Sequence, residues 1–523
     1  MNKQEKQKKE APTRRLSPIR ILIAIVLLAV IAYAVFINVK QLEENRFVSN
    51  STPWFAPYVD VTATPYFDFE KLGTTPAKNV VLAFIVSDKE DACTPSWGSV
   101  YNLVKAQDSL DLDRRIARLR QLGGDASVSF GGLLNDELAI NCTDEQKLKE
   151  AYKSVIEKYS VYTLDFDLEG NGLSNTDAAV RRAKVVAAIQ QELRDHGKNL
   201  AVWLTLPVIP QGLTDTGTNA VATMLTNGVD LAGVNIMTMN YGQSRVNGQT
   251  MAQASERALL ETHRQLGILY SNAGISLTNA TLWKKIGATP MIGQNDLITD
   301  IFTLDDAKDL NTYIQNQGIL RLSMWSANRD VQCGDNYANL SRASDSCSGL
   351  KQDALAFINT LSLGLEGTIQ NNVMTTQEES IDESSFIDDP ATSPYQVWSE
   401  NNIYLEGTKV VWHKNVYQAK WWTQGDLPDN PVLQSWQTPW QLIGPVLPGE
   451  KPVEQLKLPE GTYPEWSGTK QYNSGDKVMF NGVPFTAKWW TLGDSPAAAT
   501  ADPTSSPWQA LSQVQIEEIL KGK

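Results

Sequence analysis

Histidine and cysteine are scarce in this sequence, which has 3 histidines and 4 cysteines among 523 residues. No paired CxxC pattern occurs, so a zinc site has little support. Positive charge is also in deficit, since 46 Lys and Arg stand against 59 Asp and Glu and the formal net charge is -13. Such a surface repels phosphate backbones and argues against a nucleic-acid partner. No nucleotide, metal or other cofactor is indicated.

Hydrophobic residues make up 42% of the chain and charged residues 20%, as in folded proteins. A chain of 523 residues is too long for one ordinary domain. We therefore expect two or more domains.

A basic tail, residues 1–20, precedes an uncharged apolar run at 21–37, so residues 21–40 are predicted to be a membrane anchor or a signal segment. Ala32-Tyr33-Ala34 resembles a signal-peptidase site, whereas the long basic tail favours an uncleaved anchor with its tail in the cytoplasm. We expect a single-pass membrane protein whose main part lies outside the cytoplasm, or a protein secreted after cleavage.

All four cysteines, Cys93, Cys142, Cys333 and Cys347, lie on this exported side. An even number of cysteines in an oxidising compartment favours two disulfides, for which three connectivities exist. Proximity in sequence favours Cys93 with Cys142 and Cys333 with Cys347.

Short β-branched and apolar runs alternate with helical stretches over residues 50–363, the pattern of a parallel sheet wrapped by helices. Strands are expected at residues 56–61, 80–86, 126–130, 163–169, 201–206, 233–239, 287–292 and 320–325. This number of strand-helix units in a stretch of this length predicts an α/β fold of the (β/α)8 TIM barrel type.

The amino-acid composition of the chain changes after residue 363. Residues 364–393 are acidic and polar without an apolar period, which predicts a flexible linker, with a solvated loop of the barrel as the alternative. Residues 394–446 and 462–512 then repeat one another at a constant offset of 68 residues, with a Pro- and Glu-rich linker at 447–461. We expect the repeats to form two small all-β modules.

Asp165, Asp167 and Glu169 alternate with apolar residues along the expected strand 163–169. In a barrel the apolar face meets the helices, so the three acids should point into the interior. Carboxylates about 6.6 Å apart in a shielded interior cannot all ionise cheaply, so one should keep a proton near neutral pH and act as a general acid. Glu169, last in this row, would lie at the rim where barrel enzymes place their chemistry.

This row and its neighbours resemble glycoside hydrolase family 18, in particular bacterial chitinases with a compact barrel. The ordered motifs are Phe-Ala-Pro-Tyr-Val-Asp at 55–60, Ser-Phe-Gly-Gly at 129–132, Asp-Phe-Asp-Leu-Glu-Gly at 165–170, Trp-Leu-Thr-Leu-Pro at 203–207, Met-Thr-Met-Asn-Tyr-Gly at 237–242, Thr-Pro-Met-Ile-Gly-Gln-Asn-Asp at 289–296 and Ser-Met-Trp-Ser at 323–326. An ordered set of this kind is highly specific.

The resemblance implies a chitinase that cleaves β-1,4 bonds between N-acetylglucosamine units with net retention and with help from the substrate's own acetamido group. Glu169 would be acid and then base, Asp167 would hold the acetamido group, and Asp165 would exchange a proton with Asp167. Trp325 would form the floor under the sugar. The implied substrate-binding residues are Tyr58, Ser129, Gly131, Gly132, Met237, Met239, Asn240, Tyr241, Gln294 and Trp325, of which Tyr241 and Gln294 would line the pocket.

Two positions depart from the family pattern. Tyr162 stands where the fullest signature has a further Asp, although the related branch often lacks it. Asn240 stands where relatives usually carry Asp, and Asn keeps the hydrogen bonding but not the charge. We expect an active enzyme with an altered pH profile, while a weakly active or non-catalytic chitin lectin stays open as an alternative.

Residues 291–323 leave room for one helix and loops, whereas many exo-acting relatives insert a domain there. This favours an open cleft and endo-type cutting. An endo-β-N-acetylglucosaminidase and lysozyme-like action on peptidoglycan remain alternatives.

The two repeats resemble carbohydrate-binding modules of family 5/12, because both contain Ala-Lys-Trp-Trp-Thr, at 419–423 and 487–491. Adjacent tryptophans in a strand face opposite ways, so one of each pair can enter the core while the other stays exposed. Trp421, Trp422, Trp489 and Trp490 are thus the candidates for stacking on chitin. Aromatic domains that bind Pro-rich peptides are the alternative.

Overall fold

The computed structural model describes residues 52–337, 339, 341–381, 386–447, 449–453, 456–500 and 505–522. The basic tail 1–20 and the segment 21–40 lie outside these residues, so both interpretations of that segment stay predictions. Across the described ranges, no helix is both long enough and apolar enough to cross a membrane.

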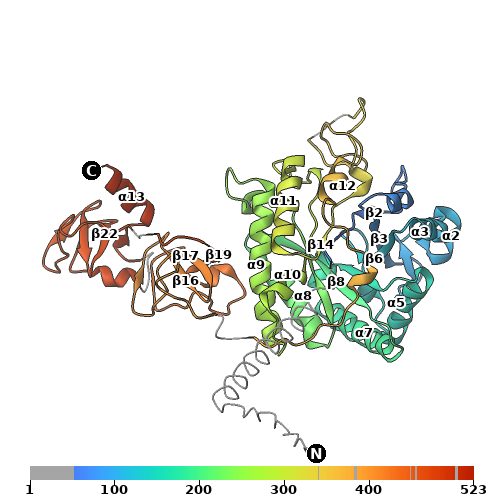
Figure 1. Ribbon diagram of the computed structural model, residues 1–523, viewed down its shortest axis with the longest axis horizontal. Helices are drawn as coiled ribbons and strands as arrows, with labels where there is room; N and C mark the ends of the chain where they lie inside the picture. The colour runs from blue at the N-terminus through green and yellow to red at the C-terminus, as the bar shows by residue number, and fades with distance from the viewer. Residues whose placement is uncertain are drawn as a thin grey trace, which may run out of the picture. The chain divides into compact units, whose positions relative to one another are not determined.

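A closed ring of parallel strands forms the first domain (Figure 1). Its strands are β1 (Trp54–Phe55), β2 (Tyr58–Asp60), β3 (Asn79–Ser87), β6 (Asp125–Gly131), β7 (Thr163–Asp167), β8 (Ala201–Ile209), β10 (Leu231–Met237), β11 (Ile286–Ala288) and β14 (Arg321–Leu322). β1 pairs with β14 and β2 pairs with β3, so the first strand of the barrel, interrupted between its two halves, closes the sheet on itself. Each of the eight expected strands overlaps a strand of this ring, and the fold is a (β/α)8 barrel.

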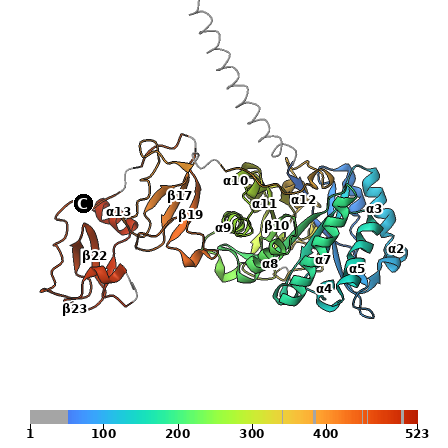
Figure 2. The same ribbon diagram turned by 90° about the horizontal axis from the view of Figure 1, so that it is seen from below.

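Helices surround the ring and follow its strands in chain order. They are α2 (Leu103–Leu110), α3 (Leu112–Gln121), α4 (Leu138–Asn141), α5 (Glu145–Tyr159), α6 (Gly170–Ser174), α7 (Thr176–Asp195), α8 (Asp215–Thr226), α9 (Met251–Asn272), α10 (Asn279–Lys284), α11 (Leu304–Gln317) and α12 (Ala356–Leu361). In both ribbon views α5 lies beside α7 and α9 beside α11 (Figure 2). Thr250 and Thr303 begin α9 and α11 with capping boxes, which satisfy backbone N–H groups that a helix leaves unpaired at its start.

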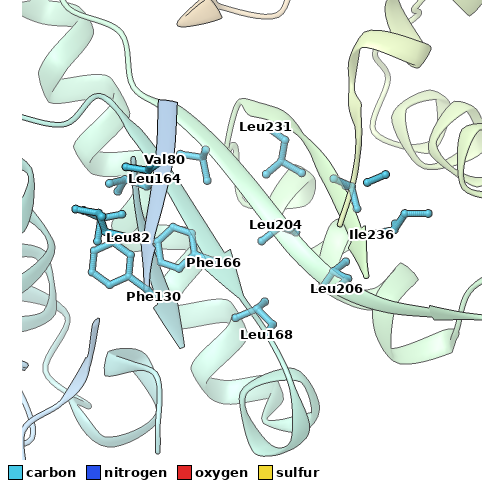
Figure 3. Close-up of a cluster of buried hydrophobic side chains, with 14 of the residues drawn as sticks. Val80, Leu82, Phe130, Leu164, Phe166, Leu168, Leu204, Leu206, Leu231 and Ile236 are labelled. Carbon is cyan, nitrogen blue, oxygen red and sulfur yellow. The ribbon is translucent and has the colours of Figure 1, made fainter. Parts of the chain in front are cut away.

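The main core lies between the ring and the helices. Leu164, Phe166 and Leu168 belong to it, together with Phe130 and Leu204 on the two neighbouring strands (Figure 3). Because successive side chains of a strand alternate, the apolar residues of β7 take this face and leave the interior face to the acids between them.

Small antiparallel elements decorate the barrel. They are β4 (Pro95–Trp97) with β5 (Tyr101–Asn102), β9 (Gly212–Leu213), and β12 (Gly293–Gln294) with β13 (Ile301–Phe302). Two disulfides join Cys93 to Cys142 and Cys333 to Cys347, the pairing that proximity in sequence favours.

The barrel domain continues beyond residue 363. Composition predicts a flexible linker from 364, but the N–H of Gly367 donates to the carbonyl of Pro53 at 2.9 Å. Farther on, the carboxylate of Glu379 accepts hydrogen bonds from the N–H of Thr278 at 2.6 Å and from the hydroxyl of Thr281 at 2.7 Å. Polar side chains that composition treats as solvated thus attach this stretch to the barrel.

The two repeats have the same fold. The strands of the first are β15 (Ile403–Tyr404), β16 (Lys409–Trp412), β17 (Asn415–Ala419), β18 (Thr423–Gln424) and β19 (Trp440–Pro445), and those of the second are β20 (Gln471–Tyr472), β21 (Lys477–Phe480), β22 (Val483–Ala487), β23 (Thr491–Leu492) and β24 (Trp508–Ala510), followed by α13 (Gln513–Lys521). Each contains one three-stranded and one two-stranded antiparallel sheet. Trp440 and Trp508 fill equivalent core positions, since their indole N–H groups donate to the carbonyls of Asp426 and Asp494.

Candidate active site

The three acids of the row follow one another along β7 and just beyond its end. Asp165 is fully buried within the barrel and Asp167, at the end of the strand, is nearly so. Glu169 is partly exposed and occupies the residue before α6, where the chain leaves the strand. The row therefore runs from the barrel interior to the carboxyl end of the sheet, which is where barrel enzymes carry out their chemistry.

Asp165 is surrounded by hydrogen-bond donors. Its Oδ1 atom accepts from Arg321 Nη1 at 2.7 Å and from Thr205 Oγ1 at 2.7 Å. Its Oδ2 atom accepts from the Tyr58 hydroxyl at 2.8 Å and from Ser129 Oγ at 2.7 Å. These partners come from four other strands, so closing the barrel is what assembles the environment of Asp165.

Asp167 has a contrasting environment. Burial raises its pKa well above the usual range, and the neighbouring charges of Glu169 and Asp165 raise it further, against a smaller opposing effect of Arg321. Its Oδ1 atom has no hydrogen-bond partner among the described residues. The pKa of Asp167 is therefore shifted towards the protonated form, and one of its oxygens has no hydrogen-bond partner among the described residues.

Glu169 is also biased towards its protonated form. Burial raises its pKa, and the charge of Asp296 adds to that effect. A carboxyl group that keeps its proton at the rim of a barrel can act as a general acid. The directions of the pKa shifts agree with the prediction that the row holds at least one proton near neutral pH.

An aromatic cluster lies beside the row. The ring of Trp325 stacks on that of Phe84, with centroids 5.5 Å apart and planes 19° apart, and lies 6.1 Å from the ring of Tyr58. Trp325 is only partly buried, which suits a platform for a sugar. Phe84 was not among the predicted residues, because an aromatic residue in a strand of the core has no signal that distinguishes it.

The two glycines of the Ser-Phe-Gly-Gly motif are required by close approach. A Cβ atom on Gly131, whose φ is +104°, would lie 2.2 Å from the carbonyl oxygen of Asp167. A Cβ atom on Gly132 would lie 2.9 Å from the ring of Phe84. Glycine at both positions lets β6 lie directly against the row and the aromatic cluster.

Asn240, the residue that departs from the family pattern, joins two loops. Its Nδ2 atom donates to Asp296 Oδ2 at 2.8 Å, and its Oδ1 atom accepts from the backbone N–H groups of Asp296 at 3.0 Å and Leu297 at 3.3 Å. An Asp in this place would lack the Nδ2 donor and would face the carboxylate of Asp296. An amide at position 240 therefore suits the negative charge of Asp296 better than a second carboxylate would.

Tyr241 and Gln294, which the resemblance places in the lining of the sugar pocket, are both buried. Tyr241 is buried in the main core, and its hydroxyl donates to Ser255 Oγ on α9 at 3.2 Å. Gln294 is buried as well, and its Nε2 atom donates to the carbonyl of Asn295 at 3.1 Å. Both follow points where the strand alternation ends, since β10 stops at Met237 and Gly293 has a φ of +67°.

The two methionines of the same motif lie at the carboxyl end of β10. Met237 is its last residue and is buried, while Met239, two residues on, is partly exposed.

The structure adds polar residues that were missed in the barrel interior. Asn235 Nδ2 donates to Thr205 Oγ1 at 2.9 Å and to Thr289 Oγ1 at 2.7 Å, which extends the network around Asp165. The signal was present in the alternation of the strands: Asn235 lies two residues before Met237, and Arg321 lies four before Trp325. Applying the two-residue period to every strand would have found them.

The tryptophan pairs of the repeats differ from expectation. In the first repeat Trp421 is 41% exposed while Trp422 is half-buried. In the second, Trp489 and Trp490 are 46% and 55% exposed, so neither ring enters the core. The prediction of one buried ring in each pair is therefore wrong for the second repeat.

We expect the substitution Asp296→Asn to shift the high-pH limb of the kcat/KM profile to lower pH. Removing the negative charge removes one of the two causes that raise the pKa of Glu169, so the acid loses its proton at lower pH. Asn240→Asp adds a negative charge beside Asp296 and should shift the limb the opposite way. The pH profiles of kcat/KM are measured on a soluble N-acetylglucosamine oligomer. High-pH limbs that do not move, or that move in the opposite directions, would contradict this prediction.

Comparison with known proteins shows which sequences are similar to this one. The chain is 34% identical over 290 residues to "Probable bifunctional chitinase/lysozyme" of Escherichia coli (strain K12), covering 54% of this chain and 31% of that protein. It is 34% identical over 285 residues to "Endochitinase 11" of Metarhizium anisopliae, covering 53% of this chain and 52% of that protein. The chain therefore spans only part of the length of both relatives.

A solved structure and a family model also match parts of the chain. The catalytic domain of a hyperthermophilic chitinase from Pyrococcus furiosus is 27% identical, with a TM-score of 0.51 over 63% of this chain and 100% of that one. Residues 465–509 match the model of carbohydrate-binding module family 5/12. The barrel is thus chitinase-like, and the second repeat is a module of that family.

Proposed function

We propose that this protein is a chitinase that cleaves β-1,4 bonds between N-acetylglucosamine units by a retaining, substrate-assisted mechanism. The observation that carries this proposal is the carboxylate row, in which Glu169 and Asp167 are biased towards their protonated forms at the carboxyl end of a barrel. The chitinases among the similar proteins support the choice of substrate.

In this mechanism Glu169 gives its proton to the glycosidic oxygen as the bond to the anomeric carbon breaks. The acetamido oxygen of the sugar attacks that carbon and forms a cyclic oxazolinium ion. Asp167, whose Oδ1 atom is unpartnered, accepts the acetamido N–H and orients the group. Glu169 then takes a proton from a water molecule, whose oxygen attacks the anomeric carbon from the face that the leaving group left. The bond between that carbon and the acetamido oxygen breaks, so the original configuration is retained.

Endo-type cutting is part of the proposal. Between β11 and β14 the chain forms only the β12–β13 hairpin and α11, so nothing in this stretch is large enough to wall off the sugar chain. The name of the Metarhizium relative agrees with this mode. Lysozyme-like cleavage of peptidoglycan is a second candidate, because the Escherichia coli relative's name includes that activity.

The remaining parts of the chain serve the barrel in this proposal. Both repeats bind chitin, since they share one fold and the second matches the module family. Linked modules raise the effective concentration of the enzyme on an insoluble polymer. The N-terminal segment holds the enzyme at the outer side of a membrane or directs its secretion.

The proposal is tested by incubating residues 45–523 with colloidal chitin, cellulose and peptidoglycan. Cellulose has the same linkage without the acetamido group, so it is the matched negative control for a substrate-assisted mechanism. Soluble N-acetylglucosamine oligomers from chitin and no products from cellulose are expected. Release from peptidoglycan alone would favour the lysozyme candidate, and binding without cleavage would favour the lectin.

Chitin binding should depend on the exposed ring pair of the second module. Replacing both Trp489 and Trp490 by Ala is expected to weaken binding to insoluble chitin about tenfold or more, because sugar faces lose their stacking surface. Leu492→Ala, which removes a neighbouring apolar side chain that is 51% exposed, is the matched control. Sedimentation assays measure the bound fraction, and equal binding of both variants would refute the role of the rings.

A further inference from the structure

The first repeat has an exposed tryptophan outside its Ala-Lys-Trp-Trp-Thr motif. Trp436 is 53% exposed, which is more than Trp421 of the motif. At the same offset of 68 residues, the sequence of the second repeat has Thr504. Trp436 is therefore a feature of the first repeat alone, and it leaves a large apolar ring in contact with water.

Trp436 is the middle residue of the short 3-10 helix η6 (Ser435–Gln437). The N–H of Gln437 donates to the carbonyl of Gln434 at 3.0 Å, and the N–H of Gln434 donates to Gln437 Oε1 at 3.2 Å. Gln434 is itself buried, so it anchors this turn in the module. The backbone that carries the Trp436 ring is therefore held in place before a ligand binds, which reduces the entropy lost on binding.

Lys420 connects this short helix to Trp421. The backbone N–H of Lys420 donates to the carbonyl of Pro439 at 2.8 Å, and its Nζ atom donates to the carbonyl of Ser435. The same Nζ atom lies 4.7 Å from the centre of the Trp421 ring. One ammonium group thus contacts both the ring of Trp421 and the residue before Trp436, so the two exposed tryptophans belong to neighbouring parts of the module surface.

The second repeat exposes its tryptophans differently. Trp489 and Trp490, the pair of its motif, are both exposed. In the first repeat Trp422 is half-buried, because it packs against a hydrophobic cluster that contains Leu405. Among the described residues each repeat therefore has two exposed tryptophans, and in the first repeat Trp436 supplies the second ring.

We propose that Trp436 and Trp421 together form the chitin-binding surface of the first repeat. This inference rests on the proposed function, in which both repeats bind chitin. The occupant is a chain of N-acetylglucosamine units, because the first repeat shares its motif and its sheets with the second, which matches the carbohydrate-binding family. The apolar faces of successive sugars stack on the two indole rings.

Binding of the full chain to insoluble chitin tests this inference. The background chain carries Glu169→Gln, so that the polymer is not cut, and Trp489→Ala with Trp490→Ala, so that the second repeat contributes little. Adding Trp436→Thr, which introduces the residue type that the second repeat has at this position, is expected to lower the association constant about threefold to tenfold. Trp436→Phe keeps an aromatic face and should bind more tightly than Trp436→Thr.

Leu427→Ala is the matched control, because it removes another exposed apolar side chain of the first repeat and should bind like the background chain. Equal binding of Trp436→Thr and Leu427→Ala would overturn the inference. So would a background chain that does not bind chitin while the chain with intact rings does. If the chain with intact rings does not bind chitin either, the proposed function fails instead.

Tryptophan fluorescence supplies a second measurement that does not depend on the Thr variant being well folded. The background chain and its Trp436→Phe variant are titrated with a soluble N-acetylglucosamine hexamer. Because a stacked sugar changes the surroundings of the indole, the Phe variant is expected to show a smaller change in emission. An unreduced change in the Phe variant would overturn the role of Trp436.

Discussion

Glu169→Gln is expected to lower kcat/KM on N-acetylglucosamine oligomers about 10²–10⁴-fold. The amide has the shape of the acid but has no acidic proton to give to the glycosidic oxygen. Glu169 is the N-cap residue of α6 and its side chain makes no capping hydrogen bond, so the substitution removes no helix cap. Product release from oligomers, measured by chromatography, gives the rate, and activity close to that of the wild type would contradict the assignment.

A carboxyl group elsewhere provides the matched control. Burial also raises the pKa of Glu256 on α9, with a further effect from Asp309. Glu256→Gln removes a second acid of raised pKa that lies outside the row, and activity should be retained. Loss of activity in both variants would mean that the assay reports general damage to the barrel rather than loss of the acid.

Arg182→Met is expected to lower the free energy of unfolding by about 3–5 kcal/mol, because it leaves a buried carboxylate without its partner. Arg182 and Glu137 are each about 1% exposed and form an ion pair at 2.9 Å. Glu137 also accepts from the N–H of Ala139 at 3.0 Å and from the hydroxyl of Tyr152. The pair lies beside the row, since the Cβ of Glu137 is 3.5 Å from where a Cβ on Gly131 would be.

Denaturant unfolding monitored by tryptophan fluorescence measures this change. Lys153→Met is the control, because it breaks an ion pair with Glu192 whose side chains are 32% and 34% exposed. Exposed pairs contribute little, so this variant should unfold close to the wild type. Equal effects of the two substitutions would contradict the importance of burial.

Much of the architecture could be predicted because it depends on local periods. The two-residue alternation along β7 separates the acids from Leu164 and Phe166, and this separation holds whatever the strand pairs with. The repeat at an offset of 68 residues predicts two similar structures, and the two repeats contain matching sheets.

Other features depend on residues far apart in the sequence. Composition could not show that Glu379 binds to the loop before α10. The type of a polar residue is the same whether its side chain is solvated or hydrogen-bonded within the protein. The same limit applies to Tyr241 and Gln294, whose side chains are buried just beyond the points where the strand alternation ends.

The sequence by itself determined that the acids of the row alternate with apolar residues, and it predicted that at least one of them keeps a proton near neutral pH. Only the tertiary structure decided how the three differ, because Arg321 and Tyr58 reach Asp165 from strands at opposite ends of the domain sequence. The spacing of residues along a strand sets which way a side chain points. The charge that it carries depends on the partners that barrel closure brings to it.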